Sequence, residues 1–157
     1  MAKDGNINRH TMNDNIYFTP DGGLGISLIN KTGAESVKGM LVIPDASVNS
    51  AFGLVPVNDP DCMGVIYGDD DGNQVADGIA CWIVISGIAK VLFQAATTRN
   101  HFARITITAD VDDAAGKAIS EALPTSPFSN DKHFQEIGHI IEAIGGAGLA
   151  LVVLHFN

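Results

Sequence analysis

Short runs of β-branched residues, separated by turns rich in Asp and Gly, are the feature that most constrains the fold of this 157-residue chain. The sequence contains 17 Ile and 12 Val against 9 Leu, and side chains that are stiff at χ1 fit a pleated strand better than a helix. Its acids are 14 Asp and only 4 Glu, and Asp favours turns and caps over helix interiors. The composition therefore predicts an all-β or mostly-β protein.

The length fits one domain with a single core of useful size. Residues 1–23 are predicted to form an extended N-terminal arm, because Asn residues interrupt its isolated apolar side chains and a Pro-Asp-Gly-Gly turn closes it. Residues 24–157 are predicted to form one β-domain, a compact β-barrel or β-sandwich with at most one or two short helices.

Apolar stretches recur after residue 23 at the 8 to 12 residue spacing that is typical of sandwiches and barrels. The predicted strands cover residues 24–30, 38–43, 52–57, 62–67, 79–86, 88–93, 103–108 and 149–156. Residues 81–85 are almost entirely apolar, which predicts a strand covered on both faces.

Two segments are compatible with either a helix or a strand. In 131–145, Phe134, Ile137, Ile141 and Ile144 have helical spacing, whereas Gly138 and the density of isoleucine favour an extended chain. In 113–123, alanine, isoleucine and leucine residues also fit one helical face. Periodicity leaves both alternatives open.

Charge and hydropathy exclude several classes of partner. The net charge is −9 and the nine basic residues are scattered, whereas binding to a phosphate backbone needs a basic patch, so no nucleic-acid partner is expected. No apolar run approaches the roughly 18 residues needed to cross a bilayer. Residues 1–15 lack the apolar stretch of a secretion signal. We therefore expect the protein to be made in a cytoplasm and not to associate with a membrane. Cys62 and Cys81 are then expected to be small buried hydrophobic residues.

Candidate sites for chemistry give weak patterns. The acidic cluster at 69–73 has Gly72 in its fourth position rather than the sixth, so it predicts a solvated turn and not an EF-hand. Gly116-Lys117 is followed by Ala118, which excludes a Walker A loop. The glycines at 145–148 precede an apolar strand and are interpreted as a hairpin turn.

The histidines offer one further candidate. His133 and His139 are six residues apart and would share a face of a strand, but in an isoleucine-rich segment such a pair is expected to pack rather than to bind a metal. No nucleophile is paired with a base. We therefore expect no enzymatic activity, no cofactor and no metal. A small metal-dependent binding module or enzyme, using the Asp clusters at 69–71 and 110–113 with this histidine pair, is the alternative from another class.

A set of motifs resembles tailed-bacteriophage virion proteins. It begins with HFQEIGHIIE at 133–142, the glycine-rich turn after it, and the ending LHFN at 154–157. In particular, the chain resembles small capsid decoration (cement) proteins, which are sometimes mislabelled as recombinase-like; the missing phosphate loop contradicts that label. The resemblance covers roughly residues 20–157, and its upstream motifs lie at 30–33, 36–39, 64–67, 76–78 and 81–89.

The resemblance implies a compact β-barrel or β-sandwich on the outer surface of an assembled capsid in the virion. Its implied partners are the major capsid protein and further copies of itself, often as a homotrimer. It also implies a strand at 137–144 that pairs across the glycine turn with 149–156. A tail or head-fibre component is the alternative within structural proteins.

The resemblance implies no catalytic, cofactor or metal residue. An acidic surface suits a protein outside the shell, away from packaged DNA. The apolar residues of the arm are expected to dock into grooves of a neighbour, since ordering such a segment costs about 1 to 2 kcal/mol per residue unless it buries apolar surface. A disordered tail or an ordinary start of the domain is the alternative for this segment. The candidate contact residues are Ile7, Met12, Ile16, Tyr17 and Phe18.

Overall fold

The protein is almost entirely β-structured. A computed structural model describes residues 15–107, 115–123 and 130–156. Strands make up 45% of it and helix only 3%, and five strands close into a barrel, which confirms the predicted fold class. Within the described ranges the only helix is α1, which has five residues. No helix of these ranges is long and apolar enough to cross a bilayer.

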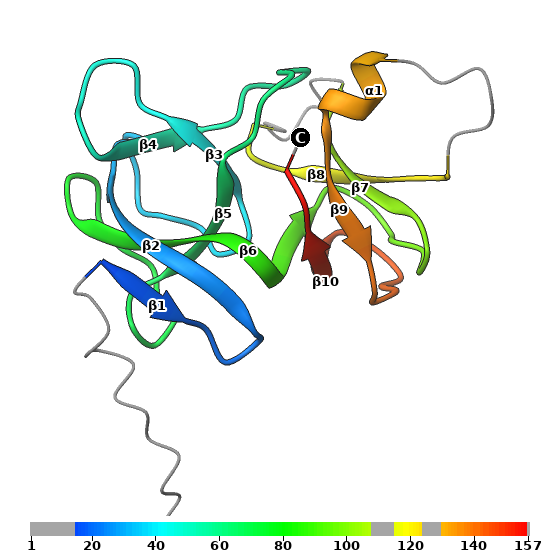
Figure 1. The fold of residues 1–157 in the computed structure, drawn as a ribbon, viewed down its shortest axis with the longest axis horizontal. Helices are drawn as coiled ribbons and strands as arrows, with labels where there is room; N and C mark the ends of the chain where they lie inside the picture. The colour runs from blue at the N-terminus through cyan, green and yellow to red at the C-terminus, as the bar shows by residue number, and fades with distance from the viewer. Residues whose placement is uncertain (1–14, 108–114, 124–129, 157) are drawn as a thin grey trace, which may run out of the picture.

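All described strands belong to one sheet, and Figure 1 labels them together with α1. In chain order they are β1 (Ile16–Phe18), β2 (Gly23–Asn30), β3 (Leu41–Pro44), β4 (Ala51–Leu54), β5 (Gly64–Gly68), β6 (Ala80–Phe93), β7 (Phe102–Ile105), β8 (Ala118–Glu121), α1 (Asn130–Phe134), β9 (Glu136–Ile140) and β10 (Gly148–Leu154).

The sheet forms two rings that share β6. The strand order is β1-β2-β4-β3-β5-β6-β10-β9-β7-β8, and an additional β2–β6 pairing closes β2, β4, β3, β5 and β6 into the first ring. The strands β6, β10, β9, β7 and β8 make the second ring, which closes through the single parallel pair Phe93–Ala118. The two rings lie side by side, with β6 running from one into the other (Figure 1).

A buried cluster fills the first ring. Phe52, Ile66 and Ile83 are each at most 1% exposed, and Val42 and Cys81 complete its centre. Partly buried side chains of β2 pack against this cluster. Because all five strands contribute to it, it occupies the interior of the barrel.

A second cluster joins the rings. Val65 and Val84 alternate with Ile66 and Ile83 along β5 and β6, so they point to the opposite face of these strands. There they belong to the same buried cluster as Ile105 of β7 and other residues of the second ring. The prediction that 81–85 is covered on both faces is therefore confirmed.

Apart from shifted ends, the strands differ from what was expected at three places. Residues 79–86 and 88–93 form one continuous strand, β6, because Gly87 adopts a φ of 84° and lets the strand bend without ending. Residues 16–18, predicted to belong to the arm, form β1 and pair with β2. The described part of 113–123 contains β8, a strand.

The segment 131–145 contains both of the structures that its sequence suggested. Helix α1 covers its beginning and strand β9 follows after Gln135. β9 pairs antiparallel with β10 in the register Val152–Ile140 and Leu154–Gly138. This is the hairpin that the resemblance implied, although its first strand ends at 140 rather than 144.

Candidate functional site

The predicted contact residues of the arm have different environments. Ile7 and Met12 lie outside the described residues. Ile16 is half-buried, whereas Phe18 is 48% exposed. Tyr17 is 5% exposed: its ring stacks on Trp82 at 5.2 Å between centroids, and its hydroxyl donates to the Asp70 carbonyl. The side chain of Tyr17 is thus already packed inside the domain, and contact of these residues with a partner stays a prediction.

The acidic cluster at 69–73 is a turn, as predicted. Gly72 has a φ of 78°, and Asp69 Oδ1 accepts hydrogen bonds from the backbone N–H groups of Asp71 and Asn73 at 2.9 and 2.8 Å. The bonds from Asn73, first from its backbone and then from its side chain, hold the pKa of Asp69 below its usual value. The second acidic cluster, at 110–113, lies outside the described residues.

Both cysteines are free and buried, which confirms the prediction for them. Burial raises the pKa of the Cys62 thiol to about 12 and that of Cys81 to about 11. Each side chain therefore stays protonated and packs as a small apolar group.

His133 and His139 do not share a strand. His133 lies on α1 and His139 on β9, because the chain changes from helix to strand at Gln135. The predicted pairing of these two histidines on one strand face is therefore wrong. His139 instead lies beside His155 and Glu136, two residues that the sequence did not single out.

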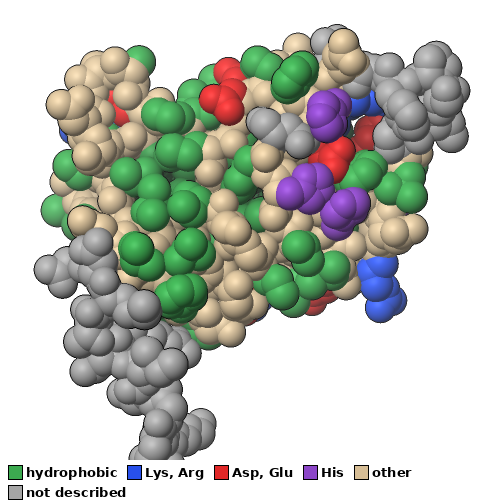
Figure 2. Space-filling model, viewed as in Figure 1, with side chains coloured by type: hydrophobic (Ala, Val, Ile, Leu, Met, Phe, Trp, Pro, Cys, Tyr) green, Lys and Arg blue, Asp and Glu red, His purple; other side chains and the backbone are tan. Residues whose placement is uncertain are grey.

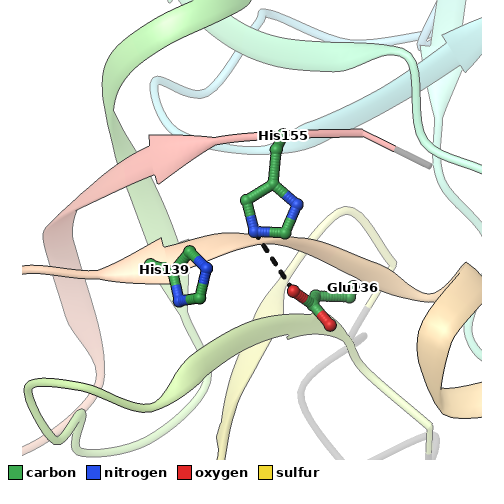
Figure 3. A group of neighbouring side chains, drawn as sticks. All are labelled: Glu136, His139 and His155. Atoms are coloured by element: carbon green, nitrogen blue, oxygen red, sulfur yellow. Dashed lines mark ion pairs between the residues drawn. The ribbon is translucent and has the colours of Figure 1, made fainter.

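Glu136, His139 and His155 converge at the end of the β9–β10 hairpin (Figure 3). One potential ligand atom from each lies within 4.8 Å of the others. β9 carries Glu136 and His139, and His155 directly follows β10, where its N–H donates to the Ile137 carbonyl at 3.0 Å. Figure 2 shows histidines gathered around an acidic side chain on this face.

A register shift explains how residues three apart on β9 reach the same site. In a regular strand, residues i and i+3 point to opposite faces. Here Ala103 of β7 pairs with Gly138 and Arg104 pairs with Glu136, so Ile137 has no partner on β7. Such a bulge adds one residue and re-aims the side chains beyond it, which brings Glu136 to the side of His139.

The site is partly enclosed by aromatic rings. The His139 ring lies 4.7 Å from that of His155 and 4.7 Å from that of Phe102, between centroids. The side chain of Glu136 is 12% exposed and that of His155 is 38% exposed. Carboxylate and imidazoles therefore meet in a small space that opens to solvent on the side of the exposed His139.

The electrostatics favour a neutral imidazole at His155. Its pKa is lowered first by burial and further by the positive charge that His139 and His133 can carry, while the negative charge of Glu136 acts in the opposite direction. Glu136 Oε1 lies 3.1 Å from Nε2 of His155, but this contact lacks hydrogen-bond geometry, and the buried Nε2 has no hydrogen-bond partner. This nitrogen thus faces the Glu136 carboxylate without a hydrogen bond.

Two imidazoles and a carboxylate are a donor set that suits a divalent transition metal. Comparison of the chain with protein-family models, curated proteins and solved structures finds no match. The chemistry of the site therefore rests on its own geometry. No local sequence signal pointed to this group, because the bulge and the β9–β10 register that assemble it are set by pairing between distant segments.

Proposed function

We propose that this protein is a non-enzymatic decoration protein of a tailed-bacteriophage head. It binds the outer surface of the assembled major capsid protein and stabilises the shell. The observation that carries the proposal is the β9–β10 hairpin within a compact barrel, since the motifs that resemble decoration proteins implied this architecture. The proposal rests on that resemblance together with the fold.

The construction of the molecule supports a mechanical role. Its two rings share β6 and one continuous buried cluster, so the body transmits force as a unit. The net charge of −9 disfavours contact with packaged DNA and suits the outside of the shell. Each copy needs about 1,000 Å² of buried interface for specific binding, and many copies sum their weak contacts over the capsid.

Phe18 is the described arm residue that best fits a capsid contact. It is the last residue of β1, which lies at the edge of the sheet, and its side chain is 48% exposed. Figure 2 shows hydrophobic side chains gathered over this part of the first ring. A self-association into trimers would place several such edges on one capsomer.

Co-sedimentation with undecorated capsids tests the proposal. The purified chain is mixed with shells assembled from the major capsid protein of the same phage, and we expect it to pellet with them. Phe18→Ser should weaken this binding. Ile79→Ser should not weaken it; Ile79 directly precedes β6 and is 57% exposed. Failure of the unaltered protein to bind these shells would reject the proposal.

Copy number in the virion separates the two structural alternatives. A decoration protein is present in numbers comparable to the capsid subunits, whereas a tail or head-fibre component is present in only a few copies. Quantitative mass spectrometry of purified virions measures this ratio, and a low ratio would overturn placement on the head surface.

A further inference from the structure

We propose that Glu136, His139 and His155 form a binding site for a divalent transition-metal ion of the Zn²⁺ class. The site lies at the open end of the β9–β10 hairpin, on the surface of the second ring (Figure 3). This proposal goes beyond capsid decoration and does not depend on it.

The ligand types select the class of metal. Imidazole nitrogen with carboxylate oxygen suits Zn²⁺, Co²⁺ and related ions, whereas Ca²⁺ and Mg²⁺ require mostly oxygen ligands. Three protein ligands leave one tetrahedral position open for water. The site is therefore expected to discriminate strongly against Ca²⁺.

The separations need only small adjustments. Metal–ligand bonds of about 2.0 to 2.2 Å in a tetrahedron place ligand atoms roughly 3.4 Å apart. Nε2 of His155 and Oε1 of Glu136 are 3.1 Å apart, and all three ligand atoms lie within 4.8 Å of one another. Because His139 is exposed, its side chain can rotate to shorten the longer separations without disturbing the core.

The missing hydrogen bond at Nε2 of His155 is an independent observation that points to a ligand. Nε2 is buried and has no hydrogen-bond partner in the described structure. Leaving a buried polar nitrogen without a hydrogen bond costs about 1 to 3 kcal/mol. A metal ion coordinated by the deprotonated nitrogen would remove that cost, while Glu136 would compensate part of the ion's charge.

The backbone holds the ligands in place before any ion arrives. β9 is paired on both sides, with β10 and β7, and the His155 N–H is bonded to the Ile137 carbonyl. Phe102 packs edge-on against the His155 ring and tilted against the His139 ring. The backbone of each ligand is thus held by strand pairing or by the His155 hydrogen bond, which lowers the entropy cost of binding.

Titration of the full-length, chelator-treated protein with Co²⁺ tests the site. We expect one equivalent to produce the visible d–d absorption of a four-coordinate ion, Zn²⁺ to displace it, and excess Ca²⁺ to leave it unchanged. Saturating Zn²⁺ should also raise the thermal unfolding midpoint, because an ion that binds only the folded state stabilises it.

Matched histidine variants locate the binding. His139→Ala removes an exposed ligand and should reduce the affinity for Co²⁺ at least about tenfold, since loss of a mere supporting residue already costs about 10- to 100-fold. His155→Gln should have the same effect. His101→Gln changes a histidine whose Nδ1 lies 3.0 Å from Ser120 Oγ, outside the cluster, and should bind as the unaltered protein does.

Circular dichroism of each variant establishes that it is folded before it is titrated. Absence of saturable Co²⁺ binding to the unaltered protein would overturn the proposal. Equal binding by folded His139→Ala would overturn it as well, because the ion would then be held elsewhere. Neither result would bear on capsid binding, which is measured without added metal.

Discussion

Asp69 shows at the scale of one residue why this chain uses Asp rather than Glu in its turns. Its short carboxylate reaches the backbone of Asp71 and Asn73, and Asn73 Nδ2 donates to its second oxygen at 3.0 Å. Asp45 binds the N–H groups of Ser47 and Val48 in the same way. A Glu side chain is one methylene too long for this geometry. Turn formation thus explains why Asp stands at these two positions.

Replacing Asp69 by Ala should lower the thermal unfolding midpoint at pH 7. The folded-state pKa of Asp69 lies below its ordinary value of 3.8, so its contribution is present above that value and is lost as the pH falls through the lowered pKa. The difference between the unaltered protein and Asp69→Ala should therefore shrink below pH 3.8. Thermal unfolding followed by circular dichroism at a series of pH values measures it.

Asp71→Ala is the matched control for this turn. It removes the same charge from the same exposed loop, but the Asp71 carboxylate forms none of the turn's described hydrogen bonds. A midpoint that falls as much in Asp71→Ala as in Asp69→Ala would show that charge, and not turn geometry, is responsible.

At the scale of the element, β6 depends on Gly87. This residue lies where the strand leaves the first ring, and its φ of 84° is one that residues with a Cβ adopt only at a cost. A Cβ there would also overlap the carbonyl oxygen of Gly22 on the neighbouring chain segment. Both effects make glycine necessary at this position.

Gly87→Ala should therefore lower the free energy of unfolding by about 1 to 3 kcal/mol. Urea denaturation followed by Trp82 fluorescence measures the change. Gly53→Ala on β4 is the control, because its Cβ would meet no atom within 4 Å and its φ is not positive. Comparable losses in the two variants would contradict a special role for the bend in β6.

The strands could be predicted where a local run of apolar residues marks them in the sequence. The apolar runs at 24–30 and 149–156 are observed as β2 and β10 with almost unchanged bounds. β1 was missed because its three residues are held by long-range contacts, above all the stacking of Tyr17 on Trp82. The predicted strands 79–86 and 88–93 stop on either side of Gly87, since sequence alone does not show that a glycine bends a strand that continues.

The candidate metal site could not be predicted for a related reason. Glu136 and His139 are three residues apart, which places side chains on opposite faces of a regular strand. They share a face here because Ile137 forms a bulge without a partner on β7. His155 reaches them through the β9–β10 register. A bulge and a register are properties of paired strands, so neither is written in the residues of one strand.

At the scale of the whole molecule, a polar network ties the two rings together. Arg104 of β7 is 7% exposed, and its Nε donates to Gln135 Oε1 at 2.9 Å. Gln135 in turn donates to Asn58 Oδ1 at 2.9 Å, from the loop between β4 and β5. Glu121 lies 3.7 Å from the guanidinium and compensates its charge. A buried charge needs such partners to be tolerated.

Gln135→Ala should lower the free energy of unfolding by about 1 to 3 kcal/mol, since it leaves buried donors of Arg104 without their acceptor. Equilibrium urea unfolding measures the loss. Gln74→Ala removes an exposed amide of the same size and should leave the stability nearly unchanged. An equally stable Gln135→Ala variant would mean that the network does not contribute to holding the rings together.

The sharing of β6 has a consequence for how the chain acquires its structure. Residues 80–86 of β6 pair within the first ring and residues 87–93 pair within the second ring. Neither ring therefore has all its strand partners without β6. A nascent chain that has emerged only as far as residue 93 still leaves Ala89, Val91 and Phe93 uncovered, waiting for β10 near the terminus. All five strands of the first ring lie at or before residue 93, so this ring can close while synthesis continues, whereas the second ring must wait until β10 has emerged.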